Sequence, residues 1–501
     1  MQDVTHAAPE DSRPPILEPG RNCWRAEHCE RASAIVDAAD YYHFARETML
    51  AARQRIMVIG WDFDTRIKLE PQNRENSQTL GDFILALAKD RPDRSIEILK
   101  WNFGMWKRLV QPAVLWMLWR WKLTRAIRFC FDGAHPPGCS HHQKILVADD
   151  RTAVCGGIDM STARWDTPEH LDDDPRRVLP NGKPYPPWHD VTMMLSGAAA
   201  AALGELGCDR WYRATSDRLE PLPASEEELW PDDLPAQFEN IIVGIARTQP
   251  EYEGRPEIRE IEALYLDMIA AARRFIYIEN QYFTSGKIAA AVAERLKESD
   301  PPEIVMVMPR SADGWLEQKA MDAARIRLTQ MIGKADRLRR FRIYVPVTQR
   351  GQDIYVHAKV MIVDDTLLRI GSSNLNNRSL GLDSECDVVI DAAIEQNRHA
   401  RDAIKELRLR LLAEHLGVSP ETFADVHEGH RSLIVAIEAL RDEGKTLELL
   451  ELEETSELED FLAENELLDP ESADGFFEPI SERGLKKRWR EVSRWRPWKR
   501  K

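Results

Sequence analysis

Two segments of the sequence place a histidine and a lysine two positions apart, each ahead of an apolar run. The first reads HQKILVAD and holds His142 and Lys144, and the second reads HAKVMIVD and holds His357 and Lys359. Residues two apart on a β-strand point to the same face, so each imidazole and ammonium group would face one spot. An imidazole can act as nucleophile or proton donor, and an ammonium group can hold phosphate oxygens. The pattern predicts phosphodiester chemistry, in a scheme that needs no metal ion or cofactor.

The two segments keep one register over eighteen positions. Aspartate follows at the seventh position after the histidine, glycine at the fourteenth and a polar residue at the seventeenth: Asp149, Gly156 and Asp159 in the first segment, and Asp364, Gly371 and Asn374 in the second. A lone histidine at a strand end would more often serve a structural hydrogen bond, but two copies in register favour a repeated half-site. The two aspartates follow the apolar strand residues, so we expect them to bind loop backbone groups.

Further candidates surround these segments. Asp190 and Glu385 each precede an apolar, strand-like run, VTMML and CDVVI, and could orient the imidazoles as equivalent residues of two halves. Ser372, next to the second motif glycine, is a candidate for substrate binding. Two interpretations stay open for Glu279 and Asn280 at the end of a strand: they line the pocket, or they only pin a loop.

The chain organisation agrees with a duplicated plan. Its 501 residues suggest about three units of ordinary domain size. We expect a polar N-terminal segment (1–30), a first half (31–218), a linker rich in proline and acidic residues (219–235), a second half (236–418) and an acidic, then basic tail (419–501). Helices are expected at 41–53 and 258–273, and strands at 55–60, 95–99, 127–131, 144–147, 191–195, 275–278, 304–308 and 360–363.

The sequence resembles the phospholipase D superfamily, whose signature is HxKxxxxD followed by a glycine-containing turn and an asparagine or similar polar residue. The resemblance covers most of residues 35–418 and looks closer to the eukaryotic-type phospholipases D than to the minimal nucleases. It also includes GWDFD (60–64), RWDTPEH (164–170), PWHD (187–190), IYIENQYF (276–283) and NNRSLGLDSE (376–385). It implies an α/β fold of two similar α/β/α sandwich domains with pseudo-two-fold symmetry and one shared active site.

The resemblance also implies a two-step reaction. His142 attacks phosphorus and becomes a phosphohistidine, while His357 protonates the leaving alcohol, and water or another alcohol then releases the phosphatidyl group. The implied phosphate ligands are Lys144, Lys359 and Asn374. Asp159 stands where many members carry asparagine, and a carboxylate there would repel phosphate unless it is protonated or turned away. It is therefore either a substrate ligand or a structural turn residue.

The expected activity is hydrolysis of the head-group phosphodiester of glycerophospholipids to phosphatidic acid. The chief alternative is a phosphatidyltransferase of the cardiolipin synthase type, which would use the same residues with a lipid alcohol in place of water. The formal charge of −16 argues against a nuclease or other protein that holds nucleic acid over its whole surface. A non-enzymatic lipid-binding module would be expected to have lost some of the four motif histidines and lysines, and none is lost.

Two tryptophan-rich segments are candidates for contact with a phospholipid membrane. The segment 101–121 holds five tryptophans among arginines and lysines, and residues 483–501 hold three tryptophans with ten basic residues and one acidic residue. The first could instead be a partly buried helix, and the second could fold against residues 447–482, which hold 14 acidic and no basic residues.

The cellular compartment is predicted from sequence features that the chain lacks. Seven scattered cysteines without a CxxC pair favour a reducing environment. The start of the sequence has no basic segment followed by an apolar run, and no stretch reaches the roughly 18 apolar residues of a membrane span. We expect a cytoplasmic protein, with peripheral attachment at the inner face of the membrane as its route to lipid. No oligomer is required to complete the site.

Overall fold

The computed structural model of the chain describes residues 13–71, 78–102, 112–220, 222, 229–311 and 315–450. The elements of the first half are β1 (Arg25–Val36), α1 (Ala38–Ala51), β2 (Arg55–Gly60), α2 (Leu80–Asp90), β3 (Ser95–Trp101), α4 (Pro112–Lys122), β4 (Ile127–Asp132), β5 (Ile145–Ala148), β6 (Thr152–Gly156), β7 (Trp188–His189), β8 (Val191–Ser196) and α5 (Ala198–Thr215).

The second half repeats the order of the longer strands and helices, with short elements inserted between them, and adds elements at its end. It contains β9 (Phe238–Gln249), β10 (Ile258–Arg259), α6 (Glu260–Ala271), β11 (Phe275–Glu279), α7 (Gly286–Leu296), β12 (Glu303–Val307), α8 (Trp315–Ala335), β13 (Phe341–Val347), β14 (Tyr355–Val356), β15 (Val360–Val363), β16 (Leu367–Gly371), the π-helical turn η1 (Arg378–Leu382), β17 (Glu385–Asp391), the 3-10 turn η2 (Glu395–Asn397) and α9 (Ala400–Leu416). The chain continues through α10 (Pro420–His430), α11 (Leu433–Leu440) and β18 (Thr446–Leu449).

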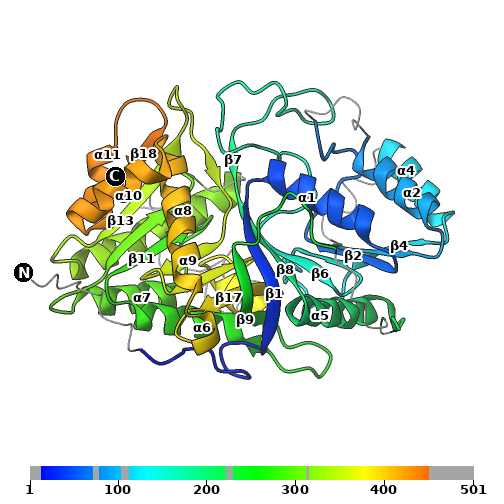
Figure 1. The fold of residues 1–501 in the computed structure, drawn as a ribbon, viewed down its shortest axis with the longest axis horizontal. Coiled ribbons are helices and arrows are strands. Elements are labelled where there is room, and N and C mark those ends of the chain that lie inside the picture. Colours follow the sequence, from blue (N-terminus) through cyan, green and yellow to red (C-terminus); the bar gives the residue numbers. More distant parts are fainter. Residues whose placement is uncertain are drawn as a thin grey trace, which may run out of the picture.

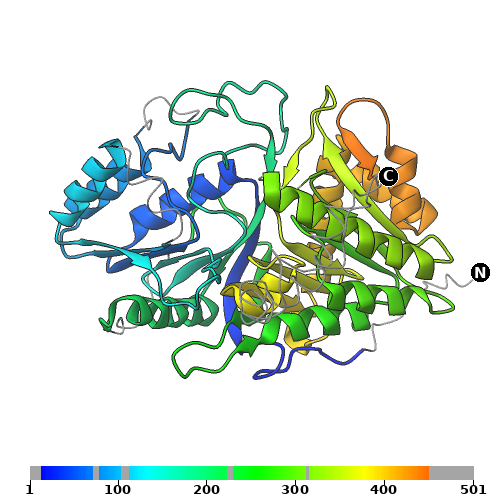
Figure 2. The same ribbon diagram turned by 180° about the vertical axis from the view of Figure 1, so that it is seen from behind.

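The strands of both halves join into one sheet. β1 and β9 are antiparallel neighbours at its centre, with Cys29 opposite Ile241. On one side of this pair follow β8, β6, β5, β2, β3 and β4, and on the other β17, β16, β15, β11, β12 and β13. Figure 1 shows the halves on either side of β1 and β9, and Figure 2 shows them from behind. The expected α/β class is confirmed, and the matching strand order gives the halves their two-fold relation.

Both faces of the sheet are covered, which explains why its inner strands read as unbroken apolar runs. All six residues of β2 are buried. Met57 and Ile59 belong to a core that extends across both halves and includes residues of α5 and α9. Ile56 and Val58 point to the other face, into a core formed with α1, α2 and α4. The corresponding core of the second half contains residues of α6 and α7. Each half is thus a three-layer α/β/α unit.

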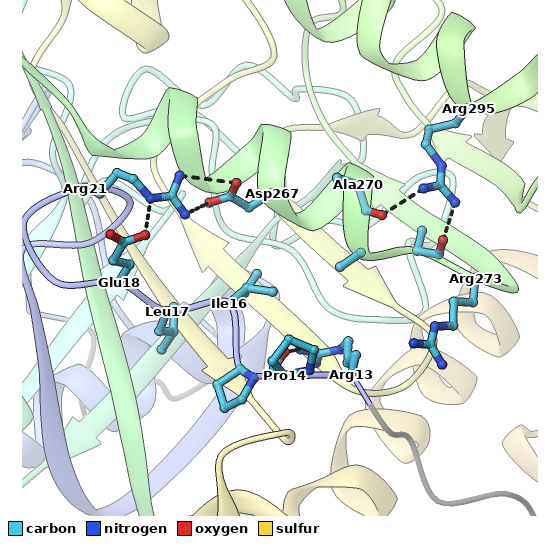
Figure 3. Close-up of a pocket in the computed structure, with 13 residues that line it drawn as sticks. Arg13, Pro14, Ile16, Leu17, Glu18, Arg21, Asp267, Ala270, Arg273 and Arg295 are labelled. Carbon is cyan, nitrogen blue, oxygen red and sulfur yellow. Dashed lines mark hydrogen bonds and ion pairs between the residues drawn. The ribbon is translucent and has the colours of Figure 1, made fainter.

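The N-terminal residues are fastened to the second half. Arg13 pairs with Asp391 at 2.7 Å, and Arg21 pairs with Asp267 at 2.7 Å. Figure 3 shows the cavity of about 630 Å³ along this seam, where Arg295 donates to the carbonyl oxygens of residues 270 and 272 at the end of α6. β1 begins at Arg25, inside the segment expected to be a polar terminus. These contacts attach residues 13–21 to the second half, so we interpret this cavity as part of a structural contact.

The chain also stays folded beyond the expected start of the tail. α10 packs on α9 and α11, and β18 pairs antiparallel with β13, with Thr446 opposite Val347. The sheet therefore gains an edge strand that has no counterpart in the first half. Residues 451–501, which hold the basic segment and most of the acidic run, lie outside the described residues.

Candidate active site

The two motif histidines stand just before corresponding strands. β5 begins one residue after Lys144, and β15 begins one residue after Lys359. The Nζ of Lys144 donates to the carbonyl oxygen of His142 at 2.9 Å, and Lys359 makes the same contact with His357. Each lysine is thereby folded back beside its own histidine. Residues of the opposite half lie beside both motifs: the backbone N–H of His142 donates to the carbonyl oxygen of Ser384 at 2.9 Å, and that of His357 donates to the carbonyl oxygen of His189 at 2.8 Å.

Each histidine is held by a carboxylate from the other half. The Nδ1 of His142 lies 3.0 Å from both carboxylate oxygens of Glu385, and the Nδ1 of His357 lies 2.7 Å from Asp190 Oδ2. Both carboxylates are fully buried. A carboxylate at Nδ1 stabilises the tautomer that carries its proton there, which leaves Nε2 available for chemistry. Because the pairing is crossed, neither half by itself contains both a motif histidine and the carboxylate that binds it.

Burial and neighbouring cations keep the imidazoles neutral. Burial lowers the pKa of His142 well below its ordinary value, and the charges of Lys144 and Lys359 lower it further. Burial likewise lowers the pKa of His357, together with Lys359 and Arg164. The lysine of each half therefore acts on the histidine of the other. A neutral imidazole with a free Nε2 can act as a nucleophile at neutral pH.

The other ionisable groups of the site are shifted towards neutrality. Burial lowers the pKa of Lys359 to about 7 and raises that of Asp190 to about 7 and that of Glu385 to about 8. A bound anion beside Lys359 and His357 would favour their protonated forms by Coulomb attraction. The site is thus arranged to gain cationic character as an anionic group enters.

The motif aspartates bind backbone amides. Asp149 accepts hydrogen bonds from the N–H groups of residues 53, 54 and 55 at 2.7 to 2.8 Å, and Asp364 accepts from those of residues 273, 274 and 275 at the same distances. Each carboxylate ties the first residues of β2 or β11 to the loop after β5 or β15. These contacts give both aspartates a structural role away from the imidazoles.

The motif glycines stand where a neighbouring strand passes too closely for a side chain. A Cβ on Gly156 would overlap the backbone and side chain of Thr192 on β8. A Cβ on Gly371 would overlap Asp387 on β17. β6 and β16 can therefore approach their neighbours only with glycine at these positions.

The residues at the seventeenth positions of the two motifs differ in their contacts. Asp159 forms an ion pair with Lys144 at 3.2 Å, and its Oδ1 accepts the N–H groups of Trp61 and Asp62 at 3.0 and 3.2 Å. This carboxylate is pinned in a turn and partly neutralises Lys144, which favours the structural alternative over a phosphate ligand. Asn374 at the equivalent position is buried, and its Oδ1 has no hydrogen-bond partner among the described residues.

Three other candidates lie behind the site. Ser372 donates to Glu385 Oε2 at 2.5 Å and is fully buried, so it supports the carboxylate and does not face a substrate. Asn280 accepts the N–H groups of Tyr282 and Leu375, both at 3.1 Å. Glu279 is fully buried and contacts the side chains of Tyr277, His189 and His415. For Asn280 and Glu279 these contacts favour pinning over lining a pocket.

Comparison with known proteins places the site in a family. A family model described as "Cardiolipin synthase, PLD-like domain" matches residues 265–408. "Phospholipase D A" of Dictyostelium discoideum is 28% identical over 370 residues, which cover 59% of this chain and 28% of that protein. "Phospholipase D1" of Saccharomyces cerevisiae is 27% identical over 482 residues, which cover 76% of this chain and 28% of that protein. The chain thus spans less than a third of the length of these two relatives.

A solved structure shares the fold. The phosphatidylserine synthase of Haemophilus influenzae aligns with a TM-score of 0.53 and 13% identity, over 76% of this chain and 88% of that one. The duplicated HxKxxxxD signature, the family model and the phospholipase D relatives agree. Together they support placing the chain in the phospholipase D superfamily. Within it, the chain stands close to the eukaryotic types.

The superfamily signature did not reveal several residues that line or support the site. Trp61 lies edge-on to His142 with ring centroids 6.2 Å apart, and Trp188 lies 5.1 Å from the His357 ring. Gln281 accepts from Lys359 Nζ at 3.3 Å, and Ser379 donates to Glu385 at 2.7 Å. All four lie in segments that carried the resemblance, which was the available signal, but a family motif does not say which of its residues reach the site.

A second group of ionisable residues lies on the far side of Asp190, whose backbone exchanges hydrogen bonds with Asp37. Ligand atoms within 4.8 Å of one another come from Asp37, His170, His189 and Glu414, and from the overlapping set His189, Glu279 and His415. Burial opposes protonation of His170, but its carboxylate neighbours raise its pKa to about 9. Imidazole and carboxylate groups of this kind could hold a divalent cation. The protonated histidines also balance the carboxylates without one.

Proposed function

We propose that the chain is a phospholipase D-type phosphodiesterase that hydrolyses the head-group phosphodiester of glycerophospholipids to phosphatidic acid. The observation that carries the proposal is the joining of two neutral, carboxylate-oriented histidines and two lysines in one buried site. The names of the relatives support a lipid phosphodiester as the substrate.

The first half-reaction transfers the phosphatidyl group to His142. Its Nε2 lone pair forms a bond to phosphorus while Glu385 stabilises the charge that develops on the imidazole. The bond from phosphorus to the head-group oxygen breaks, and His357 in its protonated form gives that oxygen a proton. Asp190 stabilises the imidazolium of His357 before this transfer. Lys144 and Lys359 hold the non-bridging oxygens as charge accumulates on them.

The second half-reaction reverses these roles at His357. Now neutral, its Nε2 accepts a proton from water, and the water oxygen forms a bond to phosphorus as the bond to His142 breaks. The step leaves bound phosphatidic acid beside a protonated His357, which returns to its neutral form by losing that proton to solvent as the anion departs. An alcohol in place of water would yield a new phosphodiester by the same steps.

Transfer to a lipid alcohol is the second candidate, favoured by the description of the family model that matches residues 265–408. Incubation with phosphatidylcholine, with and without 1-butanol, separates the two. We expect phosphatidic acid in water and phosphatidylbutanol in addition when butanol is present. A product that forms only after phosphatidylglycerol is added as an acceptor, with no hydrolysis in its absence, would favour the transferase and contradict the hydrolase.

The rate should depend on pH through Lys359. Because burial lowers the pKa of this ammonium group to about 7, the free enzyme loses that charge as pH rises through neutrality. We expect kcat/KM for a short-chain, soluble phosphatidylcholine to fall above about pH 7, while kcat holds to higher pH because the bound diester retains the proton. In Lys359→Arg the charge persists, so the fall in kcat/KM should disappear even if the absolute rate is lower. The same fall in that variant would assign it to another group.

We propose that α4 contacts the lipid surface. Trp116 and Trp119 stack at 4.9 Å and are 58% and 51% exposed, while Met117 and Trp121 on the other face are buried. Paired exposed tryptophans are suited to the interface between water and lipid. Trp106, part of the same tryptophan-rich segment, lies outside the described residues. No helix of the described part of the chain has the length and apolar character needed to cross a bilayer.

The contribution of α4 can be separated from that of the basic tail. In the double variant Trp116→Ser/Trp119→Ser we expect binding to anionic vesicles to weaken roughly tenfold to a hundredfold, with hydrolysis of a soluble substrate unchanged. Deletion of residues 483–501 should weaken binding mainly at low salt, because screening removes its electrostatic part. If the double variant sediments with vesicles as well as the parent protein does, α4 is not the contact.

A further inference from the structure

An arginine beside the proposed active site stands without an acidic partner. Among the described residues, no carboxylate lies within ion-pair distance of Arg164. Its guanidinium carbon lies 4.0 Å from the ring centroid of Trp188, whose ring lies 5.1 Å from that of His357. Its Nη1 donates to the carbonyl oxygen of Ala163 at 3.3 Å, while its Nε is buried and has no partner. The guanidinium group is therefore stacked against an aromatic ring, and some of its N–H donors are not used.

The positive charge of Arg164 affects the pKa values of residues in the site. After burial and Lys359, it is the next contributor that lowers the pKa of His357, ahead of Lys144. It also acts on Asp190 and Lys359. Arg164 affects the pKa of His357, whereas the main cations that lower the pKa of His142 are Lys144 and Lys359. Arg164 thus lies on the His357 side.

Among the cations that the described residues place around the site, Arg164 is the one whose charge is both permanent and unmatched. Lys144 forms an ion pair with Asp159 at 3.2 Å, and Lys359 has a pKa of about 7. A guanidinium group does not deprotonate in proteins. The twenty-second residue after His142 is Arg164, whereas the twenty-second after His357 is Ser379. The cation therefore has no counterpart at this spacing in the second motif.

We propose that Arg164 is a third cationic ligand of the reacting phosphodiester, which it binds at a non-bridging oxygen on the His357 side. The proposal rests on the proposed function for the identity of the diester. A planar guanidinium with N–H donors left unused suits a phosphate oxygen, and stacking on Trp188 orders it before the substrate arrives. Its charge also supports binding above neutral pH, when Lys359 has lost its proton.

Binding of glycerophosphocholine, measured by titration calorimetry with the full chain and with every protein carrying His142→Ala, tests the proposal without turnover. In Arg164→Gln we expect the dissociation constant to rise about tenfold to a hundredfold, as for loss of a charged hydrogen bond. Arg164→Lys should recover part of this loss. Between pH 6 and pH 9 the parent protein should lose less affinity than Arg164→Gln, because after Lys359 deprotonates only the parent keeps a cation besides Lys144, which is paired with Asp159.

Arg176 supplies the matched control. It lies on the same loop and stacks on Trp165 at 4.8 Å, but it is paired with Asp174 at 2.6 Å. In Arg176→Gln the affinity should change less than about twofold. An equal loss of affinity in both variants would mean that the substitutions only disturb the loop. Unchanged affinity in Arg164→Gln would show that Arg164 does not bind the diester. Either result overturns the proposal.

A parallel titration with glycerophosphoserine locates the oxyanion. If Arg164 binds the reacting phosphate, Arg164→Gln should weaken both diesters alike. A loss confined to glycerophosphoserine would place the arginine at the head-group carboxylate and overturn the proposal. Failure of the proposed function would look different: the protein would hydrolyse no phospholipid, yet diester binding would still depend on Arg164.

Discussion

Replacing either motif histidine with alanine should reduce turnover by at least about 10⁴-fold, but the two variants should fail at different steps. Without His142 no covalent intermediate can form, because the atom that bonds to phosphorus is gone. Without His357 the nucleophile and its carboxylate remain, as Nδ1 of His142 still lies 3.0 Å from Glu385. What is lost is the proton for the leaving alcohol.

A substrate with a p-nitrophenol leaving group separates these failures, since that group departs without a proton. We expect His357→Ala to release a burst of p-nitrophenol and to accumulate an acid-labile phosphohistidine at residue 142. His142→Ala should release none above background. His141→Gln is a matched control, because His141 is adjacent in sequence but is bound to Ser384 Oγ at 2.8 Å, and it should keep most activity. Phosphate found on His357 would exchange the two roles.

Local features of the site could be read from the sequence because they depend on short spacing. β2 spans the expected residues 55–60, since a strand buried on both faces is an unbroken apolar run bounded by polar residues. The pairing of each motif lysine with its histidine follows from alternation along an extended segment. The bonding of Asp149 to a loop follows from its place after the strand.

Long-range partners could not be read in this way. His142 and Glu385 are 243 positions apart, and equivalent spacing in the two halves is equally compatible with pairing within a half or across the halves. The joining of β1 to β9 decides the matter, because it sets the halves around a two-fold axis. Asp159 shows the same limit. Its charge suggested repulsion of phosphate, but Lys144 and two backbone amides already satisfy it.

The extent of the folded chain was misjudged for a related reason. Residues 25–30 are polar enough to suggest a loose terminus, yet they form the first part of β1, where residues 25–29 pair with β9. β18 begins at Thr446, and the acidic run starts within this strand at residue 447. A strand stabilised by pairing with a distant neighbour leaves little mark on local composition.

The crossed carboxylates should produce crossed phenotypes. Asp190→Asn replaces the carboxylate at His357 Nδ1 with a neutral amide, and Glu385→Gln does the same at His142 Nδ1. An amide in place of the carboxylate favours the wrong tautomer and does not stabilise an imidazolium, so we expect losses of roughly 10² to 10⁴-fold in kcat for phosphatidylcholine. Asp383→Asn is the control on the same loop. Asp383 binds Arg378 and the Ser140 amide, and its loss should cost less than about tenfold.

The leaving group then shows which histidine each carboxylate serves. Because Asp190 acts on the proton donor, Asp190→Asn should recover most of the rate of the p-nitrophenol burst with a p-nitrophenyl ester, as His357→Ala does. Glu385→Gln should stay slow with both substrates, because attack by His142 precedes any departure. Pairing within each half would reverse this pattern, with recovery in Glu385→Gln and none in Asp190→Asn. Double variants add a second criterion: Asp190→Asn should cost little in a His357→Ala background and its full amount in a background that keeps His357, since the carboxylate acts only through that imidazole.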